Sequence, residues 1–551
     1  MNNLFNSKSI YEESFDNTDN MVFNNVLGTY NTEDFTIRLA YYIHEKLENL
    51  ESGVINHKNI DTETLIAYST FLHETIHWRQ HIGSTSGFIL SMLSPVRFLT
   101  MQSFLKIILS EIGLQKPLIK YYLDNVTTDT PEDILFQNLN NVLNNYHDLK
   151  YYKNLVIEPK IILNNANNED FLLSYGHSTA YTYINIFDAL SSFFTEDKNI
   201  EIKTEKLKAL IKNQTDSEHH EFNAFKEQNR VIPPLGLKQI FEGQARFIQL
   251  QFLYFSNRTL FDMEYFNEKG LLSGVYGVAF EQYLQIIEKK CPPSFNDPLI
   301  AIFLLICDLA INPGVAFPMD VGHEDSFFFE AIPGIRFVDL CHSAKDLLEK
   351  DSNFTVNHYS KDEYIYISNA LCKELLYSSP DEILNNVLSW PKTYSKINDI
   401  KNEEYDYSFK EEMLPIRFLL SKFFVFCEDK SKHPEFFCWT GACSTGKNIK
   451  DEYLELTEKH KAPFINQKDL DVYTSSHKNI SADRLKVVHE NFHVLNILSN
   501  IVMQWVEESG NFKHDFMNEL TYKHDSDELS ELLCEIFKNH FDYDMSLCKQ
   551  A

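Results

Sequence analysis

The chain has 551 residues, of which 44% are apolar, and it carries a formal net charge of −29 at pH 7. This apolar share excludes an intrinsically disordered chain, and the length is sufficient for a large buried core. The negative charge repels phosphate backbones, so we expect no nucleic-acid partner.

Targeting signals and cysteines bear on the compartment. The first residues have neither a basic start nor an apolar run, so no secretory signal is predicted. The longest apolar run, Leu299–Cys307, is too short to span a bilayer, and we expect no membrane partner. All nine cysteines follow residue 290, and an odd number without a secretory signal favours reduced thiols in a cytoplasmic protein.

The hydrophobic pattern predicts a mainly α chain of the α+β class, built from many helices. Residues 1–35 are expected to be an irregular lead-in, followed by a helix over 35–50. Asp61 can cap a long, largely apolar helix that ends near Gly83. Further helices are expected over 84–125, 171–194, 231–255, 273–289 and 298–311, and the Asn-rich segment 136–168 is expected to be exposed.

The second half of the chain combines helices with a minor β component. The segments KFFVFCED and EFFCWTG, within 421–446, predict short strands because they are rich in aromatic residues. The end of the chain is expected to be helical. The loop-forming stretch CPPSFNDP, at 291–298, predicts a boundary between two domains, 1–290 and 291–551.

The stretch FLHETIHWRQH, residues 71–81, contains an H-E-x-x-H motif formed by His73, Glu74 and His77. On a helix, residues four apart share one face, so both imidazoles can point at one ion. Imidazole nitrogen suits Zn²⁺, and two histidines leave its tetrahedral shell incomplete. Glu74 stands beside the pair, where it could take a proton from metal-bound water. The motif therefore predicts a zinc site.

A third ligand is needed from elsewhere. His81 comes eight residues after His73 with no intervening glycine, so it lies about one turn, roughly 6 Å, beyond His77 and is expected to be hydrogen-bonded or solvated. Glu242, in FEGQARF, is the best candidate because a carboxylate on an apolar helix face needs a partner, and a cation is one; the alternative is a surface glutamate on an amphipathic helix. Gly243 and Ala245 are expected to let this helix press close to the motif helix.

The HETIH helix followed by a distant E-G-x-A helix resembles the gluzincin branch of the zinc metallopeptidases. The resemblance covers these two helices, and it implies that residues 1–290 form a zincin-like helical domain. It implies that His73, His77 and Glu242 hold Zn²⁺ and that Glu74 is the general base. It also implies hydrolysis of a peptide or protein substrate by metal-activated water.

Further residues could assist such a reaction. A donor must stabilise the oxyanion, and the candidates for this or for substrate contact are Tyr175, His177 and Arg246. Arg246 lies one turn after Glu242 and could instead hold that carboxylate. Asp308, in an apolar helix, could orient a ligand histidine or be satisfied by a local donor.

A second match, VVHENFHVLNIL, contains His489, Glu490 and His493 in the predicted C-terminal, mainly helical domain. The tetrapeptide HKNI precedes both motifs, at 57–60 and 477–480, which suggests an old internal duplication or two zincin-like units. Only 58 residues follow His493. Its third ligand would have to be Glu528, Glu531 or Glu535, with Glu531 favoured by the small neighbour Cys534. The alternative is a surface helix with two solvated histidines.

Two other functions remain open from the sequence. The chain could be a catalytically idle zincin-like scaffold that binds or regulates a partner, or a peptidase whose active site is the second motif. The loop TGACSTGKN has glycines at P-loop spacing but Asn448 in place of Ser or Thr, so nucleotide binding is not expected. HED, at 323–325, is expected to cap a helix or be solvated.

Overall fold

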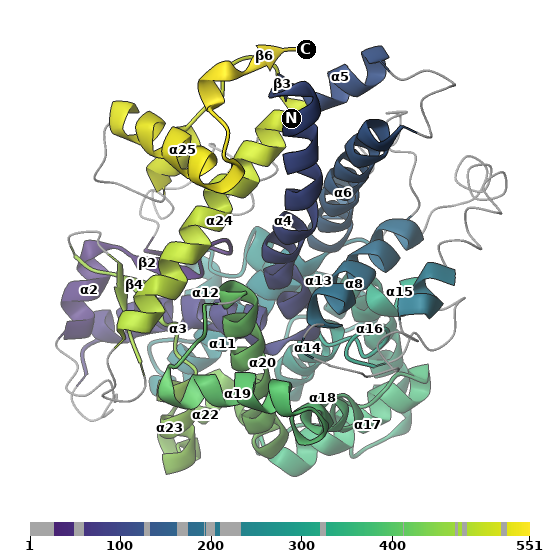
Figure 1. Ribbon diagram of the computed structural model, residues 1–551. Helices are drawn as coiled ribbons and strands as arrows, with labels where there is room; N and C mark the ends of the chain where they lie inside the picture. Colours follow the sequence, from purple (N-terminus) through teal and green to yellow (C-terminus); the bar gives the residue numbers. More distant parts are fainter. Residues whose placement is uncertain are drawn as a thin grey trace.

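The computed structural model describes residues 27–48, 60–125, 133–161, 175–191, 193, 204–209, 233–319, 327–411, 413–468, 472–476, 482–519 and 526–551. Within these ranges helices dominate and strands are few and short, which confirms the mainly α class (Figure 1). The described helices before residue 311 include α2 (Tyr41–Glu48), α3 (Thr62–Gly83), α4 (Thr85–Ile112), α5 (Leu118–Asn125), α6 (Ile134–Ile157), α8 (Tyr175–Ser191), α11 (Leu237–Ser256), α12 (Met263–Glu268), α13 (Val275–Ile286) and α14 (Pro298–Ala310).

The later helices complete the helical body. They are α15 (Phe327–Ala331), α16 (Pro333–Lys350), α17 (Lys361–Leu375), α18 (Pro380–Thr393), α19 (Ser395–Asp406), α20 (Leu414–Lys432), α21 (Pro434–Cys438), α22 (Thr440–Cys443), α23 (Asp451–Lys459), α24 (Asp483–Glu507) and α25 (Ser526–Phe541). Short 3₁₀ helices within the described ranges are η2 (Gly446–Asn448), η3 (Asp515–Glu519) and η4 (Met545–Leu547).

A small four-stranded sheet brings the start of the chain to residues near 465. Its strand order is β1 (Gly28–Tyr30), β2 (Thr36–Leu39), β4 (Phe464–Asn466) and β5 (Val472–Thr474). The β1–β2 and β4–β5 pairs are antiparallel, whereas β2 and β4 are parallel with Ile37 opposite Ile465. A second pair joins β3 (Gln115–Lys116) to β6 (Lys549–Gln550). The β1–β2 hairpin is therefore held in place by residues far along the chain.

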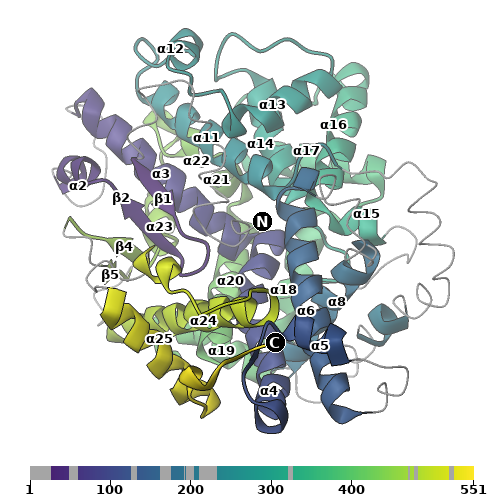
Figure 2. The same ribbon diagram turned by 90° about the horizontal axis from the view of Figure 1, so that it is seen from above.

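Helix α3 begins and ends where its sequence predicts. The Asp61 side chain accepts a hydrogen bond from the Thr64 backbone N–H at 2.7 Å, and the helix ends at Gly83. The close packing of α20 requires this glycine, because an added Cβ would lie 2.2 Å from the Phe426 ring. Helices α2, α4, α11 and α20 all contact α3, which in Figure 2 runs from the edge of the molecule near α2 toward its centre, and residues 72–83 of α3 are all buried.

Several predicted elements are wrong. Residues 421–446 form helices α20, α21 and α22 rather than strands, because α20 is buried on nearly all sides and its aromatic residues fill the core. The helix expected over 35–50 starts only at Tyr41, after β2, and β1 lies within the expected irregular lead-in. The Asn-rich segment contains helix α6, which buries Asn138, Asn145 and Asn154.

Two large hydrophobic cores and one small cluster, around Leu155 and Ile332, lie within the described chain. The larger gathers side chains from Tyr30 to Phe492, on both sides of the predicted boundary at 291, and that boundary remains a prediction. The smaller lies between α4, α6, α24 and α25, which stand together in Figure 1. By length and composition alone α4 could cross a membrane, and 61% of its most apolar window is buried inside the protein. All nine cysteines are unpaired.

Candidate metal centre

Helices α3 and α11 bring His73, His77 and Glu242 together. The Nε2 atoms of the two histidines are 3.1 Å apart, and Glu242 Oε2 lies 3.4 Å from each of them. All three residues are buried, with exposed fractions of 6%, 1% and 4%. The i, i+4 spacing on α3 sets the histidine pair, and the contact between the two helices supplies the carboxylate.

The spacing of these three atoms fits a zinc ion. Donors bound to zinc at about 2.0–2.2 Å stand roughly 3.3–3.6 Å apart at the corners of a tetrahedron. The observed separations, 3.1–3.4 Å, are close to that range. Within the described chain, Glu242 Oε2 forms no hydrogen bond of normal geometry although it is buried, as expected of an atom that needs a cation. Two imidazoles and one carboxylate can therefore hold Zn²⁺ and leave one coordination position open.

Gln80 orients His77 from behind. Its amide nitrogen donates to the Phe241 carbonyl at 3.0 Å, which fixes the amide so that Gln80 Oε1 faces His77 Nδ1 at 2.9 Å. His77 Nδ1 must then carry a proton, and its Nε2, which faces Glu242, is the nitrogen that could hold a cation. Gln80 was not identified from the sequence, although its position one turn after His77 on the same helix was a usable signal.

Burial and the mutual charges set the protonation of the cluster. Burial lowers the pKa of His73 to about 4, so this ring is neutral at pH 7. Burial also acts to lower the pKa of His77, but the Glu242 carboxylate outweighs it and raises that pKa. The pKa of Glu242 is lowered because the two histidines outweigh its burial. A bound cation would replace the proton that the Glu242 carboxylate stabilises on His77.

Glu74 is buried beside the cluster, under strand β1. Burial raises its pKa to about 7, which suits a group that takes up and releases a proton near neutral pH. A Cβ on Gly28 would lie 2.9 Å from Glu74 Oε1 and 3.0 Å from its Cγ, so only glycine lets β1 approach so closely. Tyr30, at the end of β1, stacks on His77 with ring centroids 6.3 Å apart.

Helix α13 supplies a tyrosine that was not predicted from the sequence. The Tyr276 ring lies 5.9 Å from the His73 ring, and the Arg246 guanidinium lies 3.9 Å above that tyrosine ring. Gly243 permits this approach because it faces α13, where an added Cβ would lie 3.3 Å from the Ala279 methyl group; it does not face the motif helix as predicted. No spacing rule links Tyr276 to the motif, because it comes from a third helix.

The other predicted residues have different outcomes. His81 stays outside the cluster, and its Nδ1 lies 3.3 Å from the Ser91 hydroxyl. Arg246 does not pair with Glu242; it donates to Gln249 at 2.6 Å. The side chains of Tyr175 and His177 lie outside the described residues. Asp308 is satisfied away from the metal centre by Lys430 at 2.6 Å and Tyr364 at 2.8 Å.

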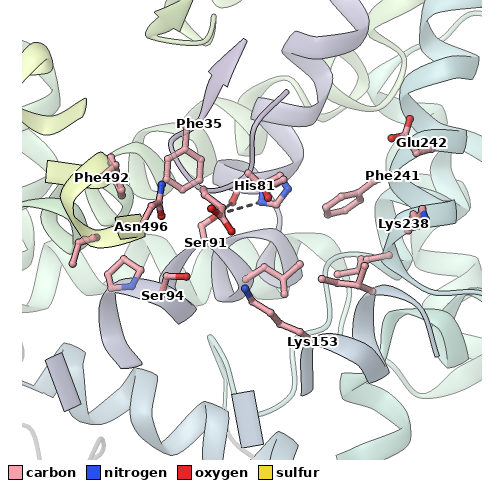
Figure 3. Close-up of a pocket in the computed structure, with 17 residues that line it drawn as sticks. Phe35, His81, Ser91, Ser94, Lys153, Lys238, Phe241, Glu242, Phe492 and Asn496 are labelled. Carbon is pink, nitrogen blue, oxygen red and sulfur yellow. Dashed lines mark hydrogen bonds between the residues drawn. The ribbon is translucent and has the colours of Figure 1, made fainter. Parts of the chain in front are cut away.

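A cavity lies beside the metal centre, with His81 and Glu242 in its wall (Figure 3). His73, Glu74 and His77 do not line it. Figure 3 shows His81 pointing toward Ser91. Phe35 and Phe492 lie on the side of the cavity opposite Glu242. The cavity therefore adjoins Glu242 rather than the two motif histidines or Glu74.

The second motif lies on α24, and the acidic residue beside its two histidines is Asp34 rather than Glu531. Asp34 Oδ2 is 3.1 Å from His493 Nε2 and 4.0 Å from His489 Nε2. Glu531 is exposed on α25. The buried face of α25 packs near Trp505, which lies on α24 more than three turns after His493. Glu490 is exposed. The HKNI tetrapeptide at 477–480, most of the one at 57–60, and HED at 323–325 lie outside the described residues.

The P-loop-like segment has the wrong context for nucleotide binding. Helix α21, not a strand, precedes it, and its glycines fall in α22 and a 3₁₀ helix. No protein-family model, curated protein or solved structure matches this chain.

Proposed function

We propose that this protein is a zinc-dependent hydrolase of peptide bonds, with His73, His77 and Glu242 as metal ligands and Glu74 as general base. The observation that carries the proposal is the buried His–His–Glu cluster at near-tetrahedral spacing with a fourth ionisable group, Glu74, beside it. The resemblance of the two helices to the gluzincin branch supports the same reaction class.

Three residues beside the proposed zinc ion have a part in this reaction: Glu74, Tyr276 and Arg246. When bound, zinc supplies Lewis acidity, which makes water easier to deprotonate and a carbonyl easier to attack. Glu74 accepts the proton of the attacking water on its carboxylate and delivers it to the departing amine. The Tyr276 hydroxyl, with its pKa raised to about 12 by burial, stays protonated and can donate to a developing oxyanion, with Arg246 beside it.

The test compares the same substitution in the two motifs. Glu74→Gln should retain zinc and lower hydrolysis of a casein or peptide-library substrate by roughly 10²–10⁴-fold, the usual contribution of a general base. Glu490→Gln, in the exposed position of the second motif, should change neither quantity. Equal activity in wild type and Glu74→Gln, at equal zinc content, would refute the proposal.

A second candidate follows from how completely the cluster is covered. His73, Glu74, His77 and Glu242 are each at most 6% exposed, and β1 packs directly on Glu74. Such burial favours an idle scaffold in which the metal stabilises the fold. In that case zinc removal lowers the melting temperature of wild type and of Glu74→Gln equally, and neither protein hydrolyses peptides.

A further inference from the structure

We propose that Asp34, His489 and His493 form a second divalent-metal site, which fastens the β1–β2 hairpin to α24. The site takes a zinc-like cation, because two imidazoles and a carboxylate are the donors that such ions prefer. It is independent of the proposed hydrolysis and uses no residue of the first cluster.

The geometry supports a shared ion rather than a simple ion pair. One oxygen, Asp34 Oδ2, faces both rings, at 3.1 Å from His493 Nε2 and 4.0 Å from His489 Nε2. The three donor atoms all lie within 4.8 Å of one another. The two rings lie on the same side of α24 with centroids 4.2 Å apart. A small shift of these side chains would bring all three donors to one cation.

The burial of Asp34 is the second observation. Its side chain is fully buried, which is costly for a carboxylate unless cations compensate it. Its other oxygen accepts a hydrogen bond from the Thr36 backbone N–H at 3.1 Å. The nearest permanent cation, Arg38, approaches Oδ2 only to 3.8 Å. A metal between the two histidines would complete the neutralisation.

Other groups define how the site would change on binding. The Thr36 hydroxyl lies 2.9 Å from His489 Nε2, so it must turn away to release that nitrogen to the ion. Glu490 is exposed and is not part of the cluster, so within the described chain the motif supplies no buried carboxylate as a base. We therefore assign the site a structural role and no hydrolytic one.

The position of Asp34 connects the second site to the strand that covers the first cluster. It lies in the turn between β1, which packs on Glu74, and β2, which pairs with β4. Its neighbour Phe35 packs between Trp78 of α3 and Phe492 of α24, at centroid distances of 6.0 and 4.8 Å. A metal at Asp34 would thus hold the strand that covers the first cluster.

The experiment measures zinc per chain in the full-length protein after chelator treatment and dialysis against zinc. Wild type should hold two equivalents, and Asp34→Asn and His493→Gln should each hold one. Glu242→Gln should also hold one, since it removes the other site. A circular-dichroism melt establishes that each variant is folded, and His493→Gln is the milder change because its side chain is 20% exposed.

A second readout separates binding from folding. In a His73→Gln/His77→Gln protein, added zinc should still raise the melting temperature, and Asp34→Asn should abolish that rise. Wild-type zinc content in both Asp34→Asn and His493→Gln would overturn the proposal. Loss of one equivalent in those variants, with none lost in Glu242→Gln, would support this site while removing the proposed hydrolytic centre.

Discussion

Helices α3 and α24 carry the same five-residue motif in very different surroundings. On α3 all three motif residues are buried, whereas on α24 Glu490 is exposed and the His493 side chain is 20% exposed. The helical spacing pairs the histidines in both cases. The neighbouring carboxylate differs. On α3, Glu242 of α11 places its Oε2 atom 3.4 Å from the Nε2 atoms of both histidines. On α24, Asp34 of the β1–β2 turn places its Oδ2 atom 3.1 Å and 4.0 Å from the two Nε2 atoms.

This contrast shows that the motif places two histidines on one face of a helix, while the neighbouring elements determine what surrounds them. The glutamate inside the motif becomes a candidate base only where burial raises its pKa, as it does for Glu74. The same residue type one position after the first histidine of α24 faces solvent. Substitutions at matched positions of the two helices can therefore sharpen or break the comparison.

The largest expected difference concerns the residue that follows the second histidine of each motif. Trp78 is fully buried against Phe35 and Phe418, whereas Val494 is 39% exposed. Trp78→Ala should lower the free energy of unfolding by about 3–5 kcal/mol, and Val494→Ala should change it by about 0.5 kcal/mol or less. Urea unfolding of the metal-free proteins measures both, and equal losses would show that α24 is as deeply packed as α3.

The parts of the fold that local chemistry determines could be predicted from the sequence. Asp61 and Gly83 mark the two ends of α3 because capping and close helix packing depend on single residues. The helix predicted over 231–255 is also present, as α11, although it starts only at Leu237. The aromatic residues of 421–446 misled the prediction, since full burial of α20 removes the amphipathic period that distinguishes a helix from a strand.

The candidate site was accessible to sequence reasoning only in part. His73 and His77 follow from helical spacing, and Glu242 follows from the cost of a carboxylate on an apolar face; the structure brings the three together. Asp34 could not be found in this way, because it meets His493 through a tertiary contact across 459 residues. Tyr276 and Gly28 were missed for the same reason, as each reaches the site from a separate element.

The next prediction compares the groups that hold a histidine of each pair. Gln80→Leu removes the acceptor of His77 Nδ1 and should weaken zinc binding by about 10–100-fold, the usual effect of losing such a partner. Thr36→Val removes a hydroxyl that competes for His489 Nε2 and should not weaken binding. Chelator-competition titrations measure each affinity, with Asp34→Asn or Glu242→Gln present so that one site is titrated at a time.

Either result could fail in an informative way. Unchanged zinc affinity in Gln80→Leu would mean that packing of α3 alone orients His77. Weaker binding in Thr36→Val would mean that the threonine hydroxyl supports the second site rather than competing with it. In both cases the two motifs would differ less than their surroundings suggest.

The smallest effect concerns His81, whose matching position on α24 is the apolar residue Ile497. His81 is 4% exposed, between Tyr30 and Phe241 with ring centroids 5.5 Å from each. Burial, with a smaller contribution from His77, lowers the His81 pKa from 6.5 to about 3. The unfolded chain therefore binds a proton on His81 more readily than the folded chain does. The contribution of the neutral His81 ring to folding stability is complete above pH 6.5 and is lost as the pH falls from 6.5 toward 3.

At pH 5 this loss amounts to about 2 kcal/mol relative to pH 7, from the separation of the two pKa values. His81→Gln should remove that part of the pH dependence of unfolding, measured in urea at both pH values without metal. Wild type, measured in the same way, is the reference and should keep that part of the pH dependence. An unchanged pH dependence in His81→Gln would mean that His81 opens to solvent at low cost, and that α3 is less rigid around its motif than its burial implies.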